Sequence, residues 1–173
     1  MASCCAGGVS AENVAVYKDL CRRVQGTNIN AQTLLATDYL NHFNEIVMIL
    51  DILPDCPECF EDARRWQPKS YEQHFADSTL SDSELAVEAY RHSPLRFRRP
   101  FERTVEHMDG LVLFALRRLE GPVANDDRPA IRRIALAAGG RLTALIATAS
   151  GIIHGNVATV GQRDIDELLA RRP

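Results

Sequence analysis

A short sequence pattern occurs twice and places histidine and carboxylate side chains three residues apart. Residues 39–45 read YLNHFNE and residues 71–77 read YEQHFAD, so both copies follow Tyr-x-x-His-Phe-x-acid. On a helix, this spacing puts each histidine beside the acid of its own copy. Helical bundles build metal sites from such side chains when facing helices project them inward. The repeat therefore provides four candidate metal ligands: His42, Glu45, His74 and Asp77.

A third histidine, His107, could add a ligand from a later helix. Imidazole together with carboxylates suits iron, manganese or zinc, and the residue types do not select among them. Two observations weigh against a metal site. His42 falls on an apolar stripe, where a hydrogen bond to a neighbouring carboxylate is the commoner role, and the Glu-x-x-His order of di-iron bundles is reversed here. Metal binding is therefore the alternative function.

The sequence Cys-Pro-Glu-Cys at residues 56–59 could bind zinc through two thiolates or exchange a disulfide. One pair is only half of a zinc site, and no strand–helix–strand pattern supports a thioredoxin-like context. The simpler expectation is that Cys59 packs as a small hydrophobic residue and that Cys56 is partly exposed.

Other catalytic or cofactor-binding patterns are weak. Ser150 and His154 lack the strand–turn–helix context of a nucleophile elbow, and the glycine pairs match no phosphate-binding loop. Tyrosines 39 and 71 with Trp66 and inward histidines could surround haem or flavin, but the residue after Cys59 is not the histidine that covalent haem attachment needs. The first expectation is therefore a protein without a cofactor.

The last residues of the chain have an amphipathic helical pattern. Ile165, Leu168 and Leu169 share one face, acidic residues stand near the start, and arginines stand at the end, as the helix dipole favours. Residues 162–169, QRDIDELL, resemble the peptides with which flagellar switch proteins and the chemotaxis phosphatase bind a phosphorylated response regulator. The resemblance implies that the apolar side chains enter the regulator's groove with the acids at its rim. The resemblance covers only this segment. The expected partner-binding residues are Gln162, Ile165, Asp166, Leu168 and Leu169. Docking of the segment on its own domain is the competing interpretation.

Composition favours a cytoplasmic protein without nucleic-acid or membrane partners. The net charge of −3 and pI of about 5.9 give little support to phosphate-backbone binding. No apolar run reaches the length of a membrane span, and the N-terminal MASCCAGG lacks the features of a secretion signal. The odd number of cysteines, five, suits a reducing compartment.

Helix start and stop signals predict an all-α fold, an irregular bundle of three long helices and several short ones. We expect a disordered N-terminus (1–9), one helical domain (10–158) and a C-terminal amphipathic helix (159–173). A first helix should run from about Ser10 to Gln25, and two short helices should lie between 70 and 93. The long helices should run from Asn28 or Asn30 to Pro54, from Phe101 to Gly121-Pro122, and from Ile131 to Ile152. Gly139-Gly140 in the last of these indicates a kink or a close helix approach.

The two function hypotheses follow from these patterns. No complete catalytic set is present, whereas the C-terminal helix can dock. The sequence therefore favours a non-catalytic regulatory or adaptor protein that contacts another protein, with a bacterial response regulator as the candidate partner and a homo-oligomer left open. The alternative is a metal-binding bundle using the histidines and acids named above.

Overall fold

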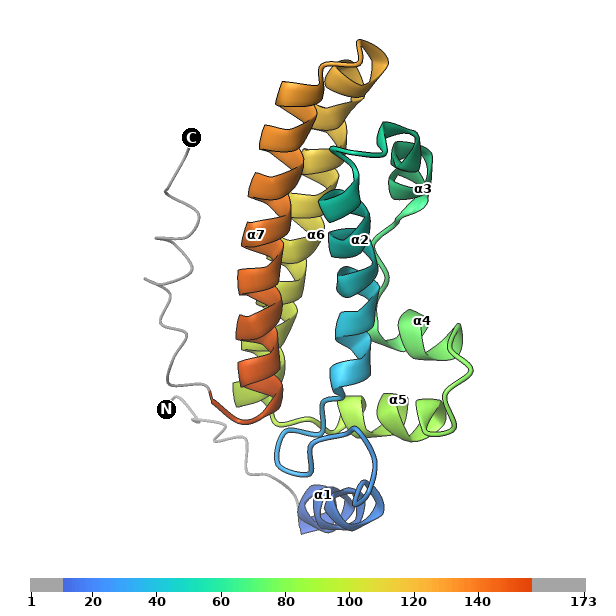
Figure 1. Ribbon diagram of the computed structural model, residues 1–173. Helices are drawn as coiled ribbons and strands as arrows, with labels where there is room; N and C mark the ends of the chain where they lie inside the picture. Colours follow the sequence, from blue (N-terminus) through green and yellow to red (C-terminus); the bar gives the residue numbers. More distant parts are fainter. Residues whose placement is uncertain (1–10, 157–173) are drawn as a thin grey trace, which may run out of the picture.

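The computed structural model describes residues 11–156 (Figure 1). Seven α-helices occur in this part of the chain, together with two 3-10 turns, and these elements confirm the predicted all-α class. The α-helices are α1 (Ala11–Arg23), α2 (Asn41–Ile52), α3 (Phe60–Arg65), α4 (Tyr71–Ala76), α5 (Ser83–Arg91), α6 (Leu95–Ala124) and α7 (Arg128–Ile153). The 3-10 turns are η1 (Thr37–Leu40) and η2 (Pro57–Cys59).

Helices α2, α6 and α7 run side by side and form the body of the bundle, with α1 across one end and α3, α4 and α5 along the flank (Figure 1). A tight turn joins α6 to α7. The Asp127 carboxylate caps α7 by accepting the N–H of Ala130 at 3.0 Å, and Pro129 occupies the first turn, where its missing N–H is tolerated. The long antiparallel pair α6–α7 is therefore the scaffold of the fold.

The second helix is shorter than the sequence pattern predicts. Residues 28–36 form a loop closed by an isolated bridge between Ile29 and Ala36, and helix α2 starts only at Asn41. The Asn30 side chain accepts the N–H groups of Gln32 and Thr33, and this local bonding competes with helix formation. The apolar periodicity that suggested a helix here comes from loop side chains that fold into the core.

The helix predicted from Phe101 to Pro122 extends further at both ends, so Pro100 and Pro122 lie inside it. Helix α6 begins at Leu95, before Pro100, and continues past Pro122 to Ala124. Each proline removes one backbone hydrogen bond within two turns of a helix end, and packing of α6 along α7 outweighs that loss.

Gly139 marks a close approach of helices, which resolves the alternative left by the sequence. Helix α7 is continuous through Gly139 and Gly140. A Cβ atom on Gly139 would lie 3.2 Å from Asp51 Oδ1 and 4.0 Å from Leu50 Cβ, whereas one on Gly140 would meet nothing within 4 Å. Gly139 therefore allows α2 to pack closely on α7, and Gly140 faces outward.

Most buried core positions are aliphatic, as the composition predicts, but one side of the core is aromatic. We call this part the aromatic cluster. Its ring contacts join Tyr39, Phe43, Trp66, Tyr71, Phe75, Tyr90 and Phe101, and the rings of His42 and His74 lie among them.

Candidate functional site

The fold brings the two copies of the Tyr-x-x-His-Phe pattern together. The first copy spans η1 and α2 and the second begins α4. The ring centroids of Tyr39 and Tyr71 are 5.2 Å apart, and those of His42 and His74 are 6.2 Å apart. The path of the middle region, which the sequence left open, thus places the repeated residues side by side.

The tyrosines of the two copies have structural hydrogen bonds. The Tyr39 hydroxyl donates to the carbonyl of Lys69 at 2.7 Å, and the Tyr71 oxygen accepts the N–H of Ala36 at 2.8 Å. Tyr71 also stacks on Tyr90 at a centroid distance of 4.3 Å. Burial raises the pKa of the Tyr39 and Tyr71 hydroxyls, so both stay neutral. These side chains fix the loop 28–36 and the start of α4 to the core.

His42 is held by its neighbours. Its Nε2 atom lies 2.9 Å from the carbonyl oxygen of Gln67, its ring stacks on Trp66 at 4.8 Å, and the Trp66 indole donates to the His42 carbonyl at 3.1 Å. Burial lowers the pKa of His42, and the nearby His74 lowers it further. A neutral imidazole that holds Gln67 and Trp66 is therefore the role that the geometry supports.

The other candidate metal ligands do not join His42 in one site. Asp77 pairs with Lys69 at 2.8 Å, Glu45 is exposed on α2, and His107 lies on α6. Burial lowers the pKa of His74, and the Lys69 charge adds to that effect. Among residues 11–156, no group of three or more His, Cys, Asp and Glu side chains is placed to hold a metal ion. The metal-site hypothesis stays a prediction that this arrangement does not favour.

A pocket of about 320 Å³ beside the aromatic cluster contains a carboxyl group with a raised pKa, Asp109, which is not among the predicted site residues. Asp109 lines it together with Tyr39 and Glu106, and its Oδ1 atom is buried without a hydrogen-bond partner in the described part of the chain. Burial, and then the charge of Glu106, raise the pKa of Asp109 to about 6. The sequence contained a signal for this position, because Asp109 follows Phe101 and Val105 at four-residue steps along the apolar stripe of the helix.

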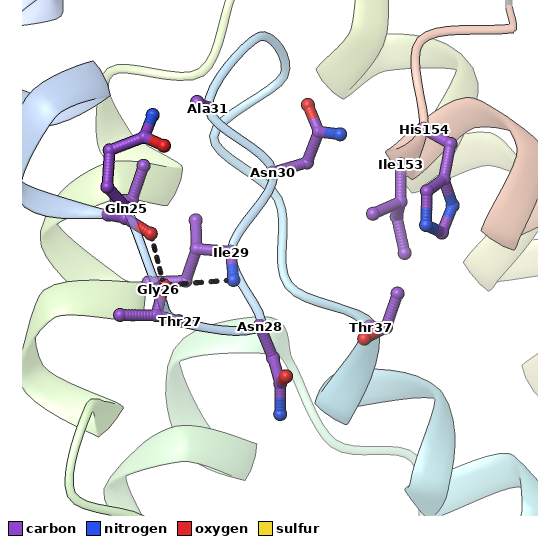
Figure 2. A pocket seen from close by; sticks show the side chains of 11 residues that line it. Gln25, Gly26, Thr27, Asn28, Ile29, Asn30, Ala31, Thr37, Ile153 and His154 are labelled. Atoms are coloured by element: carbon purple, nitrogen blue, oxygen red, sulfur yellow. Dashed lines mark hydrogen bonds between the residues drawn. The ribbon is translucent and has the colours of Figure 1, made fainter.

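A second, more polar pocket of about 400 Å³ lies where α7 ends (Figure 2). Its polar side chains are already engaged: the Thr27 hydroxyl donates to Val24 and accepts from the N–H of Ile29, and Asn28 bonds to Asp38. At the opposite wall, the His154 ring bonds the carbonyl of Ser150 at 2.7 Å. The pocket is therefore a hollow lined by satisfied turns, and its composition indicates no specific chemistry.

Cys56 and Cys59 form a disulfide at the junction of α2 and α3. Both residues are half-buried, and Cys59 packs against the hydrophobic core, as the sequence predicts for it. Cys21 is a free thiol, and its Sγ atom donates to the carbonyl of Ala31 at 2.9 Å.

Helix α7 has an exposed apolar side. By length and composition it is apolar enough to cross a membrane, a weak indication that a soluble core helix also satisfies, and only 39% of its most apolar window is buried. Within the described residues, one helical stripe of exposed side chains follows steps of four, three and four. We call this stripe the outer face of α7, and it comprises Leu136, Gly140, Thr143 and Ala147. Leu136 is 46% exposed.

The partner-binding residues predicted from the C-terminal pattern lie outside the described residues, which end at Asn156, as do the expected segments 1–9 and 159–173. Comparison of the chain with protein-family models, with curated proteins and with solved structures gives no match.

Proposed function

We propose that this protein is a non-catalytic cytoplasmic adaptor that acts through contacts with another protein. The observation that supports it most is the outer face of α7, where a long apolar helix leaves a stripe of uncharged side chains exposed. Contiguous exposed apolar surface on a soluble domain marks interaction sites. The histidines and tyrosines of the repeated pattern, in contrast, are engaged in the aromatic cluster through ring contacts and hydrogen bonds to the backbone.

The shape of the outer face suits a partner helix. Gly140 has no side chain, and Thr143 and Ala147 have small ones, so another helix can approach closely. Leu136 is the one large apolar side chain of the stripe and would be the anchor. Arg133 is exposed one turn before it and supplies a charged rim of the kind that protein interfaces have.

The C-terminal segment is the proposed second contact. It follows α7 directly in the chain, and residues 162–169 have the pattern of response-regulator-binding peptides. We therefore propose a response regulator as the partner, with Ile165, Leu168 and Leu169 as the contact residues of the segment. The two contacts would act together, because one short amphipathic helix binds weakly alone.

The test measures binding of the full chain to a purified chemotaxis-type response regulator activated with beryllofluoride. The intact protein should bind, and truncation after Val160 should abolish binding while the helical circular dichroism and the unfolding midpoint are kept. Leu136→Glu should weaken binding about tenfold, because it places a charge where an apolar anchor would be buried. Phe114→Glu is the matched control: Phe114 is 54% exposed on α6, and the Arg118 guanidinium lies over its ring.

Four results would contradict the proposal. Equal binding by the intact and truncated chains would exclude the C-terminal contact, and unfolding on truncation would make the segment part of the core. Flotation of the intact chain with lipid vesicles, lost in Leu136→Glu, would assign the outer face to a membrane instead of a protein. If only self-association in sedimentation changes with Leu136→Glu, the outer face is a contact between copies of this chain.

A further inference from the structure

We propose that Cys56 and Cys59 form a reversible redox couple that exchanges its disulfide with thiols of the glutathione class. The two cysteines lie in the turn between α2 and α3, at the end of the bundle where α7 begins. The sequence pattern alone allowed zinc binding, disulfide exchange or simple packing. Three observations favour disulfide exchange: the placement of both sulfurs, their surroundings, and the backbone that holds them.

The backbone around the pair is fixed without the disulfide. The N–H groups of Asp55 and Cys56 both donate to the carbonyl of Ile52 at 3.0 Å, and the N–H of Cys59 donates to the carbonyl of Cys56 at 3.0 Å. Pro57 and Phe60 are buried and anchor the turn to the core. The turn should therefore keep its conformation when the disulfide opens, which a reversible couple requires.

The disulfide is poorly placed to act as a structural staple. A cross-link stabilises a fold mainly by restricting the unfolded chain, and that effect grows with the length of the closed loop. Here the loop contains only Pro57 and Glu58 between the two cysteines. The cross-link also joins no distant elements, since α2 and α3 are already neighbours in the sequence. Disulfide exchange is the use that remains for a bonded pair at this spacing.

The two sulfurs have different surroundings, and this difference sets the direction of attack. Cys59 packs against the hydrophobic core, whereas Cys56 is not part of that packing. Two arginines of α7 hold the residues directly before Cys56: Arg132 pairs with Asp55 at 2.9 Å, and Arg128 donates to the carbonyl of Pro54 at 3.5 Å. These bonds hold the turn on α7. Because Cys59 packs against the core, Cys56 is the sulfur that an incoming thiol reaches.

The exchange proceeds in two balanced steps. A glutathione thiolate attacks Cys56 Sγ, the Cys56–Cys59 bond breaks, and Cys59 leaves as a thiolate that takes a proton from water. A second glutathione thiolate then attacks the glutathione sulfur of the mixed disulfide, and Cys56 leaves as a thiolate. Two glutathione molecules are oxidised to one glutathione disulfide, and the protein disulfide is reduced to two thiols.

The first experiment uses the full chain with Cys4, Cys5 and Cys21 replaced by serine, so that only the pair is counted. Serine at position 21 can still donate to the Ala31 carbonyl. The protein is equilibrated with glutathione buffers poised like the cytosol and like the secretory pathway, and thiols are counted by maleimide labelling. We expect two thiols in the first buffer and none in the second, with unchanged helical circular dichroism. A disulfide that persists in the cytosol-like buffer, or one that fails to form in the oxidising buffer, would overturn the proposal.

The second experiment tests the direction of attack in the same serine background. Cys59→Ser leaves only the thiol of Cys56, and Cys56→Ser leaves only the thiol of Cys59, which packs on the core. Each variant is mixed with glutathione disulfide, and the rate of mixed-disulfide formation is followed by mass spectrometry. Cys59→Ser should react at least about tenfold faster than Cys56→Ser. Equal rates, or faster reaction of Cys56→Ser, would overturn the assignment of Cys56 as the attacked sulfur.

Discussion

The aromatic cluster and the outer face of α7 are opposites in composition and in packing. The cluster contains the residue types that carry chemistry, histidine and tyrosine among them, and these side chains stack on one another and bond to backbone groups. The outer face is uncharged and exposed, and the hydroxyl of Thr143 donates to the carbonyl of Gly139 within its own helix. The difference teaches that the type of a residue does not identify a functional surface until its hydrogen bonds and contacts are known.

We therefore predict that substitutions in the aromatic cluster lower the free energy of unfolding, with the largest effect at Tyr71. Tyr71→Ala removes a buried ring and leaves the Ala36 N–H without its partner, so the free energy of unfolding should fall by about 3–5 kcal/mol. Tyr71→Phe keeps the ring and should cost about 1–3 kcal/mol, the penalty of one unsatisfied buried group. Urea unfolding measures both. If either Tyr71 variant keeps its stability but binds the partner more weakly, the aromatic cluster and not the outer face would be the binding region.

Asp109 provides a pH-dependent test of the same region. Its pKa is about 6 in the folded protein, above the usual value in an unfolded chain, so the folded state holds a proton between about pH 4 and pH 6 that the unfolded state releases. The contribution of Asp109 to stability is therefore present below that window and is lost as the pH rises through it. Asp109→Asn stays neutral and should be more stable than the natural protein by about 1–2 kcal/mol at pH 7.5.

The gain in the free energy of unfolding from Asp109→Asn should vanish near pH 4, where the aspartic acid is protonated and therefore also uncharged. Unfolding curves at both pH values measure this. Glu120→Gln, an exposed position on the same helix, is the control for loss of one negative charge. A gain of equal size at both pH values would show that ionisation of Asp109 is not the cause.

The smallest predicted effect concerns Gly140 on the outer face of α7. Gly140→Ala places a methyl group in open space and removes a flexible residue from a helix interior, so it should stabilise the fold by about 0.5–1 kcal/mol. The same methyl group would keep a partner helix at a greater distance, so partner binding should weaken. Gly139→Ala is the matched comparison, because its new methyl group would lie 3.2 Å from Asp51 Oδ1 and should gain less stability. Thermal unfolding and binding assays on both variants separate the two effects.

Local signals in the sequence predicted those elements whose ends depend on local bonding. Helix α4 lies within the span predicted for the short helices, and Ser70 caps it by accepting the N–H of Gln73. Helix α1 ends at Arg23, near the predicted end, and the chain turns at Gly26, where φ is +82°. The loop 28–36 was missed because its buried side chains, such as Leu34 and Leu35, reproduce a helical period without a helix. The extent of α6 was missed because proline signals are local, whereas packing against α7 acts along the whole helix.

The candidate sites were predictable to different degrees. The repeated pattern correctly drew attention to residues that lie close together, but its hydrogen bonds to Gln67 and Lys69 depend on a connection that sequence periodicity cannot trace. The packing of Cys59 was predictable from its residue type. The exposure of the outer face of α7 was not predictable, because an alanine-rich apolar helix has the same composition whether or not a neighbour covers every side.

The hydroxyl of Thr33 has a consequence for how the chain acquires its structure during synthesis. It donates to the carbonyl of Ile153 at 2.6 Å, across 120 positions of the sequence, and the Thr33 carbonyl accepts from Ser93 at 2.6 Å. The Thr33 hydroxyl thus lacks its long-range acceptor until the end of α7 has left the ribosome. Contacts of such long sequence separation slow folding. The loop should therefore lock last, and until then a nascent chain exposes Leu34 and Leu35 to chaperones.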